Sequence, residues 1–199
     1  QVKSTRYELN LENPEGLEYS FSTADGVESK KSFRDSELLI VDRVEADDGD
    51  ILVAEANYGV AGVILGDNNS GDTVLAETSN RLAQLCQINL EKNSVEASVV
   101  EKAFYSEIER EFDKAVYAPK SYEPVQMVKH RIAELVRLLR PEGELFIAGR
   151  KKEGIKRYSG FLKNLDGELE KVEQRGSTRL YRYRKASKAE IPEVEIENS

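Results

Sequence analysis

Hydrophobic residues in this chain form short continuous runs that alternate with segments of helical periodicity. A continuous apolar run of about four to eight residues is typical of a strand buried on both faces of a sheet. Apolar residues spaced three and four apart predict a helix with one buried face. The predicted strands are 51–56, 73–78, 96–104, 112–119 and 144–151, and the predicted helices are 33–44, 80–93, 123–143 and 154–165, with another starting at 59–66. Strands separated by helices predict a parallel sheet with helices on both faces.

The two ends of the chain have a different pattern. Residues 7–29 alternate polar and apolar positions between the turn signals Asn13-Pro14 and Asp25-Gly26, which predicts a β-hairpin or two short strands. Residues 168–185 predict a closing antiparallel pair. We therefore expect a doubly wound, mostly parallel α/β sheet with an N-terminal β extension. The expected divisions are an extension at 1–34, the main domain at 35–186 and an acidic, poorly ordered tail at 187–199.

Composition narrows the class of protein. Of the 199 residues, 39% are hydrophobic and 33% charged, which suits a soluble globular protein. The longest apolar runs are far short of the roughly 18 residues that a transmembrane helix needs, and the start "QVKSTRYELN" lacks the apolar region of a secretion signal. The single cysteine, Cys86, cannot form an internal disulfide and is expected to pack on a helix face. A reducing, cytoplasmic setting fits these features.

The first predicted βα unit, "ILVAEANYGVAGVILGD" at 51–67, has the layout of a nucleotide-binding loop. Glycine is missing at two places where such a loop most needs it. Asn57 is the best non-glycine residue for a left-handed backbone, whereas Glu55 is harder to accommodate. In a parallel sheet ligands bind at the carboxyl ends of the strands. The ends that we expect to matter are 53–59, 77–79, 101–104 and 116–120.

Five stretches together resemble a known family. They are "FSTADGVESKKSFRDSELLI", "GDILVAEANYGVAGVILG", "TVLAETSNRLAQLCQINLEKN", "FDKAVYAP" and "LLRPEGELFIAGRKKEGIKRY". Their order and spacing resemble the class I S-adenosylmethionine-dependent methyltransferases, and among them the methyltransferase small domain family, which includes ribosomal RNA guanine-N2 methyltransferases. The resemblance covers roughly Tyr7 to Lys185. It implies a Rossmann-like methyltransferase fold with a sheet of the seven-stranded type in 35–186 and S-adenosylmethionine as cofactor.

The resemblance also implies a cofactor site. Where this chain has "AEANYGVAG" the family has a loop similar to "LGCGYGVIG", so Glu55 and Asn57 fall at glycine positions, while Tyr58 and Gly59 match. These four residues are expected to face the methionine part of the cofactor. A carboxylate at Glu55 would weaken binding there, because it would lie near the cofactor's own carboxylate.

Glu77 matches the family's acid at the end of the second strand. An acid there can accept hydrogen bonds from both ribose hydroxyls, with Thr78 beside it. The alternative is a solvated carboxylate that helps to cap the helix starting near Ser79. The backbone around Ala103 is expected to lie at the adenine edge. Lys102 stands where the family has an acid for the adenine amine, and lysine donates only. We expect Phe104 to be a core residue.

The substrate side departs further from the family pattern. The family's Asn-Pro-Pro-aromatic motif, which holds a planar amine, is replaced by Ala118, Pro119, Lys120 and Ser121. The first three are expected to face the substrate, and no catalytic residue is assigned. Gly26-Val27-Glu28-Ser29 matches the family's Gly-Val-Phe-Ser lead-in except at Glu28, which replaces the aromatic residue. His130 is expected to be a helix-face residue, and no cluster of His, Cys and carboxylates has the spacing of a metal site.

Two functions remain open. The first is an S-adenosylmethionine-dependent methyltransferase acting on an amine of ribosomal or other structured RNA. The second is a catalytically silent relative that serves as an RNA-binding or subunit-interaction module. A net charge of −8 disfavours nonspecific nucleic-acid binding. A local basic stretch could still contact RNA phosphates, or be a solvated charged face. Its residues are Arg150, Lys151, Lys152, Lys156 and Arg157. The whole-chain resemblance favours an enzyme, and the departures favour the silent relative.

Overall fold

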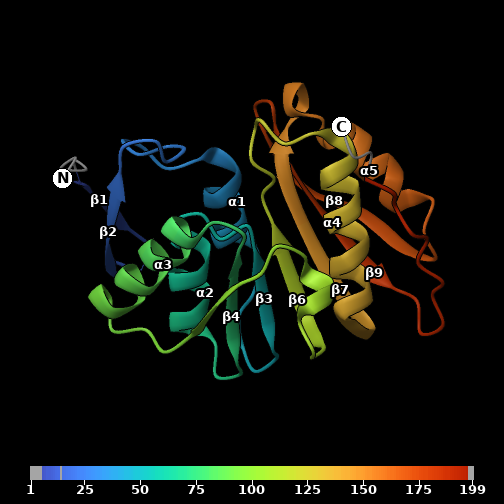
Figure 1. Cartoon of the computed structure of the whole chain (residues 1–199), viewed down its shortest axis with the longest axis horizontal. Coiled ribbons are helices and arrows are strands. Elements are labelled where there is room, and N and C mark those ends of the chain that lie inside the picture. Colours follow the sequence, from blue (N-terminus) through green and yellow to red (C-terminus); the bar gives the residue numbers. More distant parts are fainter. Residues whose placement is uncertain (1–5, 14, 197–199) are drawn as a thin grey trace.

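The computed structural model describes residues 6–13 and 15–196, and of Arg6 only its backbone. These residues form a seven-stranded sheet with the order β5-β4-β3-β6-β7-β9-β8 (Figure 1). Strands β3 to β7 run parallel to one another, β9 runs antiparallel to β7, and β8 pairs antiparallel with β9. The strands are β3 (Ile51–Ala54), β4 (Thr73–Glu77), β5 (Ser98–Glu101), β6 (Phe112–Tyr117), β7 (Leu139–Arg150), β8 (Gly167–Arg175) and β9 (Thr178–Lys185). The predicted fold class is confirmed.

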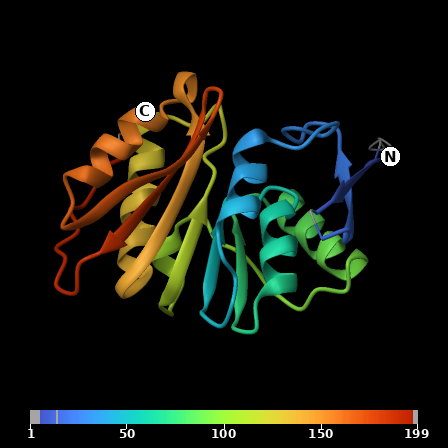
Figure 2. The same cartoon turned by 180° about the vertical axis from the view of Figure 1, so that it is seen from behind.

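Helices cover both faces of the sheet (Figures 1 and 2). One face carries α1 (Asp35–Arg43), α2 (Val60–Asn68) and α3 (Asn80–Lys92), and the other carries α4 (Val125–Leu138) and α5 (Ile155–Lys163). Successive side chains of a strand point to opposite faces. Val53 therefore packs into the core beneath α1 to α3, while Leu52 and Ala54 pack into the core beneath α4 and α5. The sheet is buried on both sides, which explains its continuous apolar runs.

The N-terminal hairpin, β1 (Arg6–Glu12) and β2 (Glu18–Ala24), confirms the predicted β extension. It is fixed to α3 by two asparagines one helical turn apart. The Asn89 side chain accepts from the Ser22 N–H at 2.7 Å and donates to the Ser22 carbonyl at 3.0 Å. Asn93 makes the same pair of hydrogen bonds with Ser20. The two amides satisfy the polar groups of β2 in the way that a neighbouring strand would.

Two predicted elements differ in length from the observed ones. The helix predicted at 123–143 ends at Leu138, and β7 begins at Leu139. Pro141 lacks an N–H and its ring disfavours a helical conformation of the residue before it, so the helix has to end there. The strand predicted at 96–104 is the shorter β5, and a single 3₁₀ turn, η1 (Tyr105–Glu107), precedes β6.

The C-terminal segment lies along α4. Residues 187–196 have no helix or strand, and residues 197–199 of the predicted tail lie outside the described residues. The Pro192 carbonyl accepts from Arg137 at 2.6 Å, and the Val194 carbonyl lies 2.9 Å from His130 Nδ1. The domain limits at 34 and 186 stay a prediction. Among the described helices, none combines the length and the hydropathy needed to cross a membrane.

Candidate functional site

The turn between β3 and α2 keeps the shape of a glycine loop with different residues. The backbone φ angles are +48° at Glu55, +56° at Asn57 and +103° at Gly59. A positive φ is uncommon for residues other than glycine, so Glu55 and Asn57 occupy positions that favour glycine. Further on, a Cβ atom at Gly62 would lie 2.3 Å from the Leu75 side chain, which explains the glycine retained there. The geometry supports the alignment of Glu55 and Asn57 with the family glycines.

Glu77 joins this turn to the tip of β4. One of its carboxylate oxygens accepts from the Asn57 N–H at 2.9 Å. The other accepts from the N–H groups of Thr78 and Ser79, at 2.9 and 3.3 Å. Ser79 itself caps α3, because its hydroxyl accepts from the Leu82 N–H at 3.4 Å. The Glu77 side chain has no solvent exposure, so it is a fixed, buried part of the turn.

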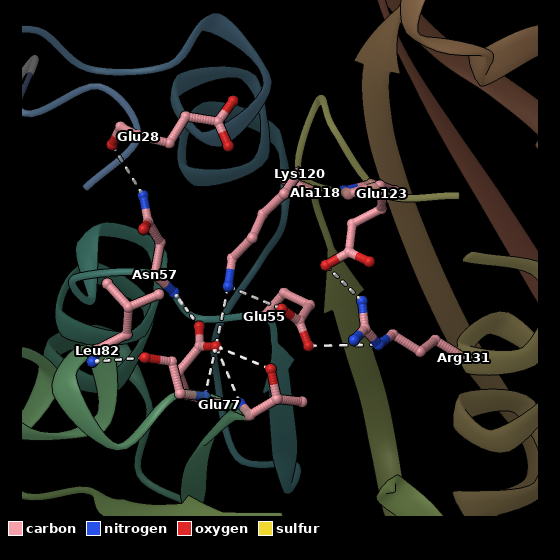
Figure 3. A network of polar contacts seen from close by, with 12 residues as sticks. Glu28, Glu55, Asn57, Glu77, Leu82, Ala118, Lys120, Glu123 and Arg131 are labelled. Atoms are coloured by element: carbon pink, nitrogen blue, oxygen red, sulfur yellow. Dashed lines mark hydrogen bonds and ion pairs between the residues drawn. The ribbon is translucent and has the colours of Figure 1, made fainter. Parts of the chain in front are cut away.

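Lys120 reaches into the same place from the loop after β6. Its ammonium lies 2.9 Å from a carboxylate oxygen of Glu55 and 2.9 Å from one of Glu77. The Lys120 residue is 5% exposed and Glu55 is 2% exposed. Figure 3 shows the lysine chain extending down toward the two acids. The cation holds together two carboxylates that would otherwise repel each other.

The second oxygen of Glu55 extends the cluster to η1 and α4. It accepts from the Tyr105 hydroxyl at 2.7 Å and lies 3.4 Å from Arg131 Nε. The Tyr105 hydroxyl in turn accepts from the Glu55 N–H at 2.8 Å. Arg131 also pairs with Glu123 at 2.9 Å. The buried charges therefore connect the turn after β3, the tip of β4, the loop after β6 and helix α4.

Burial and neighbouring charge act in opposite directions on these groups. Burial alone would lower the pKa of Lys120, but Glu55 and Glu77 outweigh it and raise that pKa above the ordinary value. Burial and the adjacent Glu55 carboxylate raise the pKa of Glu77, and the Lys120 ammonium opposes that rise. Lys120 is therefore a permanent cation at physiological pH, and the acids beside it depend on that charge.

The lead-in segment, residues 26–34 before α1, closes over the cluster. The Asn57 side-chain amide donates to the Glu28 carbonyl at 3.3 Å, and the Ser121 hydroxyl donates to the Glu28 carboxylate at 2.8 Å. Arg34, 7% exposed, donates to the carbonyls of Ala118 and Pro119 at 3.2 and 2.6 Å. The segment before α1 is thus fastened both to the turn and to the loop after β6.

One small cavity lies against Glu55. The cavity between the turn, α1 and β6 measures about 10 Å³ and is lined by Glu37, Glu55 and Ala118 among others. Hollows of about 690 and 710 Å³ lie elsewhere, one along 66–73 and 94–98 and one beside the end of α1. Neither reaches the strand tips that carry Glu77.

The structure brings together several of the predicted site residues. Glu55, Asn57, Glu77, Thr78 and Lys120 meet at the strand tips. Tyr58 instead directs its hydroxyl toward the carbonyls of Ser29 and Ser32, at 3.3 and 3.4 Å, and is fully buried. Ala118 and Pro119 are buried under Arg34, while Ala103 is exposed just after the carboxyl end of β5.

Two minor expectations have clear outcomes. Phe104 was expected in the core, which is wrong, because it is 43% exposed and contacts the His130 ring edge-on at 5.8 Å. Cys86 packs on the buried face of α3, as predicted, and its thiol lies 3.1 Å from the Asn57 carbonyl.

Sequence reasoning missed Tyr105, Arg131 and Arg34. A buried acid needs partners, but nothing in the sequence indicates which distant residues supply them.

The strand order, the turn after β3 and the acid at the tip of β4 define the class I methyltransferase fold. The sequence profile described as methyltransferase small domain matches residues 18–182. The chain belongs to this family, and the family predicted from the motifs is confirmed.

Solved structures with this fold include the Thermus thermophilus 16S rRNA N2 G1207 methyltransferase RsmC, in complex with AdoMet and guanosine. It is 19% identical with a TM-score of 0.80, and the match covers 93% of this chain and 52% of that one. This chain thus spans about half the length of that enzyme. A Geobacter metallireducens precorrin-6y C5,15-methyltransferase is 16% identical with a TM-score of 0.64, and covers 83% of this chain and 94% of its own.

A ribosomal protein L11 methylase from Lactobacillus delbrueckii subsp. bulgaricus is also similar. It is 13% identical with a TM-score of 0.61, and the match covers 75% of this chain and 76% of that one. The names of these three proteins point to an RNA, a small molecule and a protein as substrates. Likeness at such identities shows the fold, and the fold alone does not fix the substrate.

The cofactor that the family implies is S-adenosylmethionine, and the closed arrangement described here does not fit it. Glu77, the acid expected to bind ribose hydroxyls, already accepts from three N–H groups and the Lys120 ammonium. The cavity against the neighbouring Glu55 is about 10 Å³, whereas a ligand the size of S-adenosylmethionine needs roughly 300 Å³ or more. The lead-in segment and Lys120 would have to move before such a ligand could enter.

Proposed function

We propose that this protein is a cytoplasmic S-adenosylmethionine-dependent methyltransferase that acts on an amine of ribosomal or other structured RNA. One observation carries the cofactor part. Glu77 stands at the tip of β4 and is bonded to the backbone of the turn after β3, so the two parts that hold an adenosyl group in this family are still joined. Membership of the family across 18–182 supports the same activity.

The RNA part of the proposal rests on a basic surface at the carboxyl ends of the parallel strands, the end of the sheet at which Glu77 lies. We call Arg150, Lys151, Lys152, Lys156 and Arg157 the basic edge; they lie between the end of β7 and the first turn of α5. Lys151, Lys152, Lys156 and Arg157 are exposed, while Arg150 is partly engaged with Asp35 and Glu153. Because β7 is parallel to β6, its carboxyl end lies on the same side of the sheet as the loop 118–121. Exposed cations there suit phosphate contacts.

Calorimetry with S-adenosylhomocysteine tests the cofactor part. We expect binding with a dissociation constant below about 1 mM, equivalent to about −4 kcal/mol or better. Glu77→Ala should abolish most of the heat, since it removes the acceptor for the ribose hydroxyls. Lys163→Met, an exposed change on α5, is the matched control and should bind as the wild type does. Binding that survives Glu77→Ala unchanged would refute the ribose role.

Salt dependence of RNA binding tests the basic edge. Each phosphate contact that is lost makes the slope of log K against log salt shallower by about 0.7 to 0.9. We therefore expect Lys151→Ala/Lys152→Ala to bind a structured RNA more weakly and with a slope shallower by about 1 to 2. Lys163→Ala should leave the slope unchanged. An identical slope for the double variant and the wild type would show that the basic edge is only a solvated surface.

The silent relative remains the second candidate, because one observation favours it. The buried Lys120 ammonium satisfies the acids of the site without any ligand. If no heat is seen with S-adenosylhomocysteine up to about 1 mM, while the folded protein still binds RNA, the chain is an RNA-binding module of methyltransferase fold.

A further inference from the structure

We propose that the Lys120 side chain occupies the cofactor site in the unliganded protein, and that it thereby lowers the affinity of this site for adenosyl ligands. The inference rests on the proposed function, because it concerns the same site. It starts from the position of the Lys120 ammonium, 2.9 Å from Glu55 and 2.9 Å from Glu77, at the strand tips where the family places its cofactor.

Glu55 and Lys120 are complementary departures from the family pattern. An acid stands where the family has glycine, and a lysine stands where the family has the second proline of its substrate motif. Without Glu55, Lys120 would keep only Glu77 as a charged partner among the described residues. Without Lys120, Glu55 would keep only Arg131 in that role. Either change alone therefore leaves buried charges with fewer partners, which is destabilising. In the structure each neutralises the other, at 4% and 0% exposure of the side chains. The two substitutions therefore form one unit that replaces a ligand.

The contacts around Lys120 make this unit part of a closed cover. The neighbouring residues Ala118, Pro119 and Ser121 are all hydrogen-bonded to the lead-in segment, through Arg34 and Glu28. Withdrawing Lys120 would break its two ion pairs and leave Glu55 facing Arg131 and Tyr105 alone. Entry of a ligand has to overcome this loss, so the closed state lowers the apparent affinity by the fraction of molecules that are open.

The sharpest test removes both charges at once. Glu55→Gln/Lys120→Met nearly keeps the side-chain volume and removes the Glu55 charge together with that of Lys120. The buried Glu77 carboxylate then loses its ion pair and keeps its three backbone N–H donors. Glu55→Gly/Lys120→Ala also removes both charges, suits the positive φ at residue 55 and opens more space. Folding of each is checked by circular dichroism. S-adenosylhomocysteine is then titrated into each variant, with Lys163→Met as the control.

We expect at least one folded double variant to bind S-adenosylhomocysteine ten or more times as tightly as the wild type, a gain that a purely structural role of Lys120 would not produce. The proposal is overturned if no folded double variant binds S-adenosylhomocysteine more tightly than the wild type does. The proposed function fails separately. If only the variants bind, the proposed role of Lys120 is upheld and methyl transfer by the wild type is ruled out. If the wild type binds well and the variants gain nothing, the cofactor part of the proposed function stands and the proposed role of Lys120 is refuted.

Discussion

Glu37 is the buried acid with the plainest consequence at the scale of single residues. It lies on α1, 4% exposed, against the small cavity beneath the turn. Burial raises its pKa from the ordinary 4.5 to about 7, although Arg34 acts in the opposite direction. The folded protein therefore favours the protonated form of this side chain more than the unfolded chain does.

This shift predicts that Glu37 makes the fold less stable as pH rises. Below about pH 4.5 both states hold the proton, and between about 4.5 and 7 the unfolded state loses it first. The contribution lost by pH 8 is about 3 kcal/mol. Glu37→Gln should therefore raise the free energy of unfolding at pH 8 relative to the wild type, and much less at pH 5. Urea denaturation of both proteins at the two pH values measures this, and equal pH dependence would show that the acid is not protonated in the fold.

At the same scale, sequence reasoning succeeded with backbone and failed with side-chain direction. Glu55 and Asn57 could be assigned to left-handed positions because a positive φ follows from the local turn. Lys120 was expected to face a substrate, and in the structure its chain extends toward Glu55 and Glu77 (Figure 3). That direction depends on Glu55 and Glu77, which are 65 and 43 residues away in the chain, and a lysine on a loop carries no local sign of such partners.

At the scale of elements, periodicity predicted the strands and helices well, because the spacing of apolar residues within a segment determines which of its faces is buried. The exceptions were the boundary between α4 and β7, which Pro141 marks, and the strand β5, which is shorter than predicted. The contact between the hairpin and α3 was beyond local patterns. Asn89 and Asn93 lie one turn apart on α3, yet they bond to residues of β2 about 70 positions earlier. An asparagine near a helix end is common, so only the folded chain shows this role.

At the scale of the whole molecule, the fold and the site differ in how far the sequence determines them. Order and spacing of five motifs fixed the family, because a sheet with helices on both faces constrains every segment. The site depends on a few side chains from four separate segments, and these have been exchanged while the backbone kept its shape. Closure of the molecule over its own strand tips is thus a property of the assembled chain, seen in the contacts of Lys120, Arg34 and Glu28.

Burial of the Lys120 amine is the feature most open to direct measurement. Acetylation by an activated ester, followed by mass spectrometry, compares the reaction rate of Lys120 with that of the exposed Lys163. A paired, buried ammonium with a raised pKa should react at least about ten times more slowly than a free surface amine, and excess S-adenosylhomocysteine should narrow the difference. Equal rates for the two lysines in the unliganded protein would contradict the closed site.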